Sequence, residues 1–258
     1  MSIEMQQKLA KLERERNIHI LYACEAGSRA YGLASPDSDF DIRFIYLHPK
    51  EWYLSLDTNR DVIELPATDS IEISGWELTK ALRLLRKSNP SLLEWLQAEK
   101  VYQQQGYFTA RLKEIQQQAF NPRACYYHYM QMAKKNAQKS SSMEAKTTKM
   151  VLHILRPLLA CQWIKQKQTF PPNHFSLLVG ELVEKEELTQ KLTDLMAAKR
   201  SGASLYQENS TINKFIEQQL QTIEQSASSI PGGPENERDL TLALDELFRE
   251  MLHANGTK

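Results

Sequence analysis

The sequence predicts an α+β fold in which the strands come early in the chain and the helices come later. Three segments predict strands: an apolar run at 18–24, a segment rich in β-branched and aromatic residues at 39–47, and a short apolar–polar alternation at 69–77. Beyond about residue 105 apolar residues recur at helical spacing and no convincing strand pattern returns. We therefore expect a strand-containing domain at 1–105 and a helical domain at 106–258, which 258 residues can accommodate.

The first half of the chain alternates strands with short helices. Ile3, Leu9 and Leu12 form a narrow apolar stripe that predicts a docked helix over 2–16. Residues 51–56 are consistent with one helical turn and 61–65 with a short strand. A helix is expected from Leu78 to Lys87, and Asn89-Pro90 begins another, because Asn is a good N-cap and Pro suits the first helical position.

The second half is expected to be helical. The predicted helices and their connections are 107–139, a link at 140–142, 144–168, one or two helices over 176–200, 205–224, a flexible linker at about 226–237, and 239–253. Nothing in the sequence settles whether the last helix packs on this half or on a partner.

Composition limits the classes of function. Lys and Arg together balance Asp and Glu, so the formal net charge is zero and any nucleic-acid surface must be local. The three cysteines are widely spaced, which is typical of a reducing compartment and of neither a zinc site nor a disulfide framework. The charged N-terminal segment is unlike a signal peptide, and we expect a soluble cytoplasmic protein.

The segment 26–43 carries the strongest indication of chemistry. Gly27-Ser28 follows an apolar strand, and backbone N–H groups at such a helix start, together with the Ser28 hydroxyl, can hold phosphate oxygens. Ordinary turns also contain Gly-Ser, so this pair alone is weak. Residues 35–38, Ser-Pro-Asp-Ser, predict a turn that ends any helix before the next strand.

The following strand begins with paired carboxylates. Period-2 geometry places Asp39, Asp41 and Arg43 on one face and the apolar residues between them on the other. Two adjacent carboxylates are stable in water or beside a cation, and Asp oxygens suit Mg²⁺. In isolation, the pattern is more typical of a solvated strand start whose charge Arg43 balances.

Together these parts resemble the DNA polymerase beta-like nucleotidyltransferase superfamily. The sequence reads Gly-Ser-Arg-Ala-Tyr-Gly at 27–32 and Ser-Pro-Asp-Ser-Asp-Phe-Asp-Ile-Arg at 35–43, which is similar to a bacterial subfamily of predicted nucleotidyltransferases associated with RNA repair. The resemblance is close over about 18 residues and looser to about residue 200. It implies a small mixed-sheet palm domain with three carboxylates and two Mg²⁺ ions, which Mn²⁺ could replace. The implied reaction transfers a nucleoside monophosphate from a nucleoside triphosphate.

The resemblance also requires a third carboxylate on a neighbouring strand. Glu72 stands where the family places it, between Ile71 and Ile73, which alternation directs to the core. An exposed strand Glu is the plainer interpretation of Glu72, and Asp69 and Glu77 are the alternatives for the role.

Cations are expected near the triphosphate. Lys149 and Arg156 lie with Lys146 and His153 on one face of the predicted helix 144–168, and Arg29 follows Gly27-Ser28. This stripe could be a solvated face, or it could close over a triphosphate or an RNA backbone. We take Arg29, Lys149 and Arg156 as candidates that neutralise the triphosphate.

Three functions remain open. The favoured one is a magnesium-dependent nucleotidyltransferase, with the acceptor hydroxyl at an RNA end. A protein adenylylating enzyme is the second. A nucleotide- or RNA-binding module that has lost catalysis is the third. The oligomeric state is not determined by the sequence.

Overall fold

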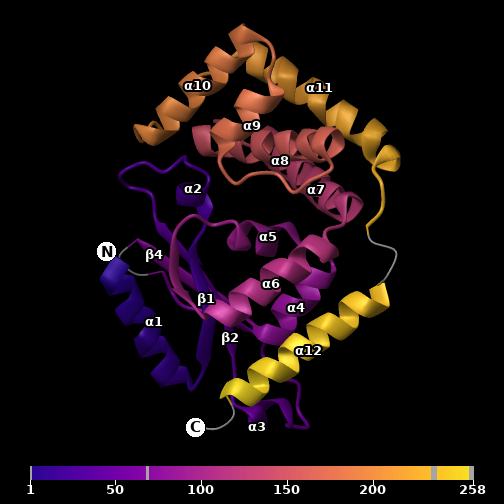
Figure 1. Ribbon diagram of the computed structural model, residues 1–258. Helices are drawn as coiled ribbons and strands as arrows, with labels where there is room; N and C mark the ends of the chain where they lie inside the picture. Colours follow the sequence, from indigo (N-terminus) through magenta and orange to yellow (C-terminus); the bar gives the residue numbers. More distant parts are fainter. Residues whose placement is uncertain (1, 68–69, 234–236, 256–258) are drawn as a thin grey trace. The chain divides into compact units, whose positions relative to one another are not determined.

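The computed structural model describes residues 2–67, 70–233 and 237–255, and these form two compact units (Figure 1). The sheet unit consists of the described parts of 1–27, 39–119 and 234–258. The helical unit consists of 28–38 and 120–233. These limits differ from the predicted domains 1–105 and 106–258, because each unit takes in a segment distant in sequence from the rest of it.

A five-stranded mixed sheet forms the centre of the sheet unit, in the order β3-β4-β2-β1-β5. The strands are β1 (His19–Glu25), β2 (Phe40–Leu47), β3 (Val62–Glu64), β4 (Ile71–Glu77) and β5 (Val101–Gln104). Strands β2 and β4 are parallel, and every other neighbouring pair is antiparallel. The predicted α+β fold with a mixed sheet is therefore confirmed, although the short strand β5 was not predicted.

Alternation along β2 decides which face of the sheet is buried. Ile42, Phe44 and Tyr46 belong to one core cluster, which also contains residues of α1 (Ser2–Arg16). Helix α1 contributes Met5, Leu9 and Leu12 to that cluster. The expected stripe is wrong at Ile3, whose side chain is 71% exposed, because Met5 is the residue in register with Leu9 and Leu12.

The other helices of the sheet unit are α3 (Lys50–Tyr53), α4 (Leu78–Arg86), α5 (Pro90–Leu96), α6 (Gly106–Ala119) and α12 (Glu237–Asn255), and all but α6 have bounds close to those predicted. The single helix predicted over 107–139 is wrong, because Asn121 caps a new helix that has Pro122 at its first position. The side chain of Asn89 caps α5 by accepting from the backbone N–H groups of Ser91 and Leu92, as its sequence predicts. Helix α12 contacts α4 and α6. The C-terminal helix thus belongs to the sheet unit and not to the helical region in which the sequence placed it.

The helical unit contains α7 (Pro122–Ser141), α8 (Thr148–Lys167), α9 (Phe175–Leu182), α10 (Glu186–Arg200), α11 (Ser210–Ser226) and the 3₁₀ turn η1 (Ala227–Ser229). The link predicted at 140–142 is wrong for its first two residues, which continue α7. The linker predicted at 226–237 begins later than expected, because Ala227 and Ile230 are buried; residues 234–236 lie outside the described part. No helix in the described part of the chain is apolar over a length that would cross a bilayer.

The segment 28–38 packs within the helical unit, although it connects two strands of the sheet unit. Leu33 belongs to the core cluster formed by α8, α9 and α10. The backbone carbonyl of Tyr31 accepts a hydrogen bond from the N–H of Phe175, 3.1 Å away. The short helix α2 (Gly27–Ala30) therefore begins where the chain passes from the sheet unit to the helical unit.

Candidate functional site

Two of the predicted carboxylates lie side by side on the sheet. In the parallel pair β2–β4, Asp41 is the register partner of Glu72. Their neighbours Ile42 and Ile73 are also register partners and point into the core below α1. Because alternate residues of a strand face opposite sides, Asp41 and Glu72 share the face away from that core. Asp41 of the motif and Glu72, which lies 31 positions later in the chain, thus form one acidic pair.

Arg43 binds both carboxylates. Its Nη2 donates to Oε1 of Glu72 at 2.7 Å and to Oδ1 of Asp41 at 3.2 Å. The side chains of Arg43 and Asp41 are 19% and 21% exposed, whereas that of Glu72 is 50% exposed. The guanidinium offsets the repulsion that two neighbouring carboxylates would otherwise experience. The chain itself therefore supplies one positive charge to this pair of carboxylates.

Gly27 lies directly against the carboxylate of Asp41. A Cβ atom at residue 27 would overlap Oδ2 of Asp41, and the backbone of Gly27 has φ +61°, which favours glycine. The backbone N–H of Ala26 also donates to the carbonyl oxygen of Asp41 at 2.7 Å. The two halves of the motif, represented by Gly27 and Asp41, are thus in contact within the sheet unit.

Glu25 is hydrogen-bonded to the backbone of Asp41, and the sequence analysis did not identify it as a site residue. It ends β1, its side chain is 4% exposed, and its Oε1 accepts the backbone N–H of Asp41 at 3.1 Å. Its Oε2 accepts the hydroxyl of Tyr102. A carboxylate at the end of an otherwise apolar strand was the available signal, because a buried Glu needs hydrogen-bond partners.

The remaining carboxylates have different positions. Asp39 lies two residues before Asp41, just outside β2. Glu77, an alternative for the third carboxylate, caps α4 by accepting from the N–H of Thr79 at 2.8 Å and accepts the Tyr53 hydroxyl at 2.6 Å. Asp69, the other alternative, lies outside the described residues. Among the described residues, no three His, Cys, Asp or Glu side chains form a ready metal cluster.

Ser28 and Arg29 lie in the helical unit. The carbonyl of Ser28 accepts the N–H of Leu33 at 2.8 Å, and Nη2 of Arg29 donates to the carbonyl of Ser38 at 2.7 Å. Ser38 also donates its N–H to the carbonyl of Ser35 at 3.0 Å, which is the turn predicted at 35–38. Arg29, near the start of the segment 28–38, is thereby hydrogen-bonded to the last residue of that segment.

The predicted basic stripe on α8 is wrong as a single face. Arg156 is only 6% exposed, and its guanidinium carbon lies 3.7 Å from the ring centroid of Tyr31. Lys146 precedes the helix and pairs with Glu208 at 3.4 Å. Lys149 and His153 remain exposed. Burial of Arg156 against an aromatic ring, instead of water, follows from the packing of the segment 28–38 on α8.

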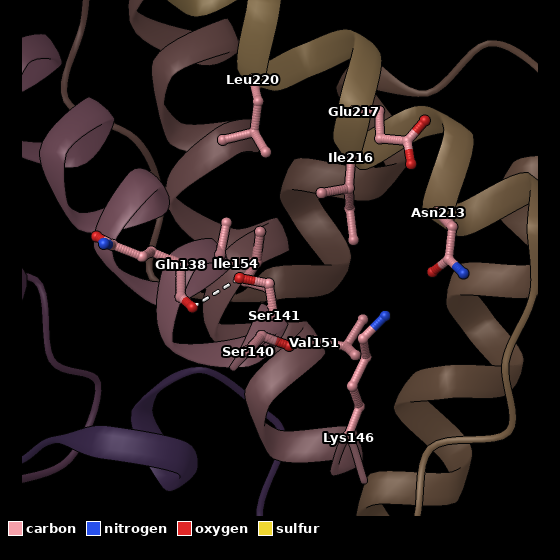
Figure 2. Close-up of a pocket in the computed structure, with 11 residues that line it drawn as sticks. Gln138, Ser140, Ser141, Lys146, Val151, Ile154, Asn213, Ile216, Glu217 and Leu220 are labelled. Atoms are coloured by element: carbon pink, nitrogen blue, oxygen red, sulfur yellow. Dashed lines mark hydrogen bonds between the residues drawn. The ribbon is translucent and has the colours of Figure 1, made fainter. Parts of the chain in front are cut away.

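Lys146 lines a hollow of about 390 Å³ between α7, α8 and α11 (Figure 2). Figure 2 shows Ile216 and Leu220 of α11 pointing toward the side of the hollow where Val151 and Ile154 of α8 lie. Apart from Lys146 of the predicted stripe, none of the described residues predicted to bind phosphate or metal lines this hollow. It is therefore separate from the chemistry that the sequence predicts.

Positive charges crowd around His153. Burial lowers the pKa of His153, and the nearby cations Lys149, Arg156, Lys199 and Lys139 lower it further. The pKa of Lys199 is lowered by burial and by Lys149. The repulsion between these positive charges therefore makes the protonated forms of His153 and Lys199 less favourable.

The predicted site residues divide between the units. Gly27, Asp39, Asp41 and Glu72 belong to the sheet unit, and Ser28, Arg29, Lys149 and Arg156 belong to the helical unit. Within the sheet unit, the structure brings Gly27, Asp41 and Glu72 together.

Comparison with known proteins gives three findings. The model of the RNA repair pathway DNA polymerase beta family matches residues 1–250. The chain is 41% identical over 243 residues to the uncharacterized protein YcgL of Bacillus subtilis (strain 168), covering 93% of this chain and 92% of that protein. A crystal structure of a nucleotidyltransferase-like protein from Exiguobacterium sibiricum 255-15 is 11% identical, with a TM-score of 0.33, covering 97% of this chain and 80% of that one.

Proposed function

Because the chain belongs to the RNA repair pathway DNA polymerase beta family, we propose that it is a metal-dependent nucleotidyltransferase acting on RNA ends. In the proposed reaction a nucleoside monophosphate passes from a nucleoside triphosphate to an acceptor hydroxyl. The observation that carries the proposal is the register pairing of Asp41 with Glu72, with Gly27 against the Asp41 carboxylate. This arrangement places acidic oxygens beside the glycine of the phosphate-binding motif.

The donor set fits a hard divalent cation. Asp41 and Glu72 present carboxylate oxygens on one face of the sheet. Asp39 lies two residues before Asp41, directly before β2 begins. These three residues would hold two Mg²⁺ ions, for which Mn²⁺ could substitute. A bound divalent cation would supply positive charge for the attacking and leaving oxygens of an in-line displacement. Arg43, which binds the same carboxylates, must release at least one of them when the site is loaded.

The chain's own groups would orient the substrates. Gly27 and Ser28 would offer backbone N–H groups and a hydroxyl to the phosphates. Arg29, which directly follows Ser28, would add positive charge. Arg156 is buried against Tyr31, so its contribution would be the charge it places beside the connecting segment. Glu72, the most exposed of the carboxylates bound by Arg43, would accept the proton of the acceptor hydroxyl.

The test is a transfer assay with matched variants. Purified protein is incubated with Mg²⁺, each α-³²P-labelled nucleoside triphosphate in turn, and total cellular RNA plus protein. Asp41→Asn and Glu72→Gln are compared with Glu64→Gln, which removes the charge of another exposed strand glutamate bound by an arginine. We expect label on RNA with the wild type and with Glu64→Gln, and loss of label with the other two.

The assay also separates the alternative functions. Label on protein and not on RNA would identify a protein adenylylating enzyme. Triphosphate binding without transfer or pyrophosphate release would identify a binding module. Transfer to RNA at the normal rate by Asp41→Asn would overturn the proposed role of the acidic pair.

A further inference from the structure

Four cationic or titratable side chains from three helices gather on the helical unit. Lys149 and His153 are one turn apart on α8, so their side chains share a face. Both are exposed. They are the part of the predicted stripe that the structure leaves at the surface.

Helices α7 and α10 add one lysine each to this face. Asn136 of α7 donates from Nδ2 to the carbonyl of His153 at 2.7 Å, and Lys139 follows Asn136 by three residues, one helical turn. On α10, Met196 packs in the core cluster that also contains Leu152 of α8, and Lys199 is one turn beyond Met196. The electrostatic effects of both lysines on His153 agree with this placement. We call Lys139, Lys149, His153 and Lys199 the cation cluster.

The cation cluster has no acidic counterpart in the described part of the chain. No carboxylate there forms an ion pair with any of its members. Other lysines of the same helices do have such partners, since Lys134 pairs with Glu224 and Lys167 pairs with Glu181. In a chain of zero net charge, unpaired like charges destabilise the free protein, and a bound anion would offset that cost.

We propose that the cation cluster binds consecutive phosphate groups of the RNA that accepts the nucleotide. The inference rests on the proposed function, which supplies RNA as the acceptor. Cations on three helices form an extended surface, which matches a run of backbone phosphates better than one compact triphosphate. Ammonium and imidazolium groups contact such phosphates without reading bases, so the site should hold RNA of any sequence.

The test measures binding and requires no catalysis. Affinity for a single-stranded RNA oligonucleotide is measured by fluorescence anisotropy, in EDTA and without nucleotide, over a range of salt concentrations. The triple variant Lys139→Gln/Lys149→Gln/Lys199→Gln is compared with Lys134→Gln/Lys167→Gln/Lys191→Gln, which removes one lysine from each of the same helices. A third protein is the charge-preserving variant Lys139→Arg/Lys149→Arg/Lys199→Arg.

A plot of log K for RNA binding against log salt concentration has a negative slope, and we expect the cluster variant to make this slope shallower by about 2. Near 0.1 M salt this change corresponds to a loss of about 100-fold in affinity. The matched control should bind nearly as the wild type, and the Arg variant should restore binding. Circular dichroism checks that each variant is folded.

The outcomes separate this inference from the proposed function. Unchanged RNA binding by the cluster variant would overturn the inference even if nucleotide transfer were intact. Weakened binding of a nucleoside triphosphate with normal RNA binding would assign the cluster to the nucleotide and also overturn it. Weakened RNA binding in a protein that transfers no nucleotide would still support the site, because the assay contains neither metal nor triphosphate.

Discussion

The carboxylate of Asp41 occupies the space that a side chain at residue 27 would fill. A Cβ atom on Gly27 would overlap Oδ2 of Asp41, and the backbone of Gly27 is in the left-handed region at φ +61°. Gly27 and Asp41 are therefore coupled sterically. A side chain at residue 27 would displace the Asp41 carboxylate.

Gly27→Ala should inactivate the protein more than it unfolds it. The methyl group would displace the Asp41 carboxylate, and a displacement of about 1 Å in a reacting group can cost about 100-fold in rate. Nucleotide transfer and thermal unfolding are measured together. The control is Gly180→Ala in α9, where nothing lies within 4 Å of an added Cβ, so transfer should be unchanged. Equal activity of both variants would contradict the steric coupling.

Glu25→Gln should change the metal dependence of transfer. The Gln amide has one acceptor oxygen where Glu25 has two, so either the N–H of Asp41 or the hydroxyl hydrogen of Tyr102 loses its acceptor, at a cost of about 1–3 kcal/mol of stability. Because Asp41 would shift, the Mg²⁺ concentration for half-maximal transfer should rise several-fold.

Glu77→Gln is the matched control for Glu25→Gln. Glu77 is also buried, accepts a backbone N–H and accepts a tyrosine hydroxyl, but it caps α4. Glu77→Gln should therefore lower the melting temperature without altering the Mg²⁺ dependence of nucleotide transfer. The same Mg²⁺ dependence in both variants would reduce Glu25 to a structural residue.

Arg43→Met should make the protein depend more strongly on divalent ions for stability. Without the guanidinium, Asp41 and Glu72 repel each other, so the melting temperature in EDTA should fall. Added Mg²⁺ should then raise the melting temperature by more than it does in the wild type, because no side chain competes for the carboxylates. Arg60→Met, which breaks an exposed pair with Glu64, serves as the control. An equal Mg²⁺ response in all three proteins would argue against metal binding at this pair.

RNA binding should strengthen as the pH falls. Burial and the cations Lys149, Arg156, Lys199 and Lys139 hold the pKa of His153 below its usual value of about 6.5, so they disfavour protonation of His153 in the free protein. Bound phosphates raise this pKa, and the complex therefore takes up a proton. Lowering the pH from about 8 toward 5.5 should tighten binding.

His153→Gln should remove this pH dependence, whereas His19→Gln in β1 should retain it. The same lowered pKa means that the unfolded chain binds more protons than the folded one. The free protein should consequently lose stability as the pH falls below about 6.5, and His153→Gln should lessen that loss. A pH dependence that survives in His153→Gln would assign the titration to another group.

Much of the fold could be predicted because its signals are local. The apolar alternation of β2, the Asn89-Pro90 start of α5 and the turn at 35–38 depend on neighbouring residues alone. The bounds of the three main predicted strands agree with the structure to within one or two residues. The stripe on α1 was wrong only at Ile3, because several apolar residues competed for one face.

The sequence by itself determined that Asp41 and Arg43 share one strand face, because the period of a strand is two residues. Only the tertiary structure decided that Glu72 stands opposite Asp41, that Glu25 supports it, and that Arg156 is buried on Tyr31. It also decided that α12 joins the sheet unit while 28–38 joins the helical unit. These outcomes depend on strand register and on which apolar faces meet. Such pairings join residues far apart in the chain, and no local pattern specifies them.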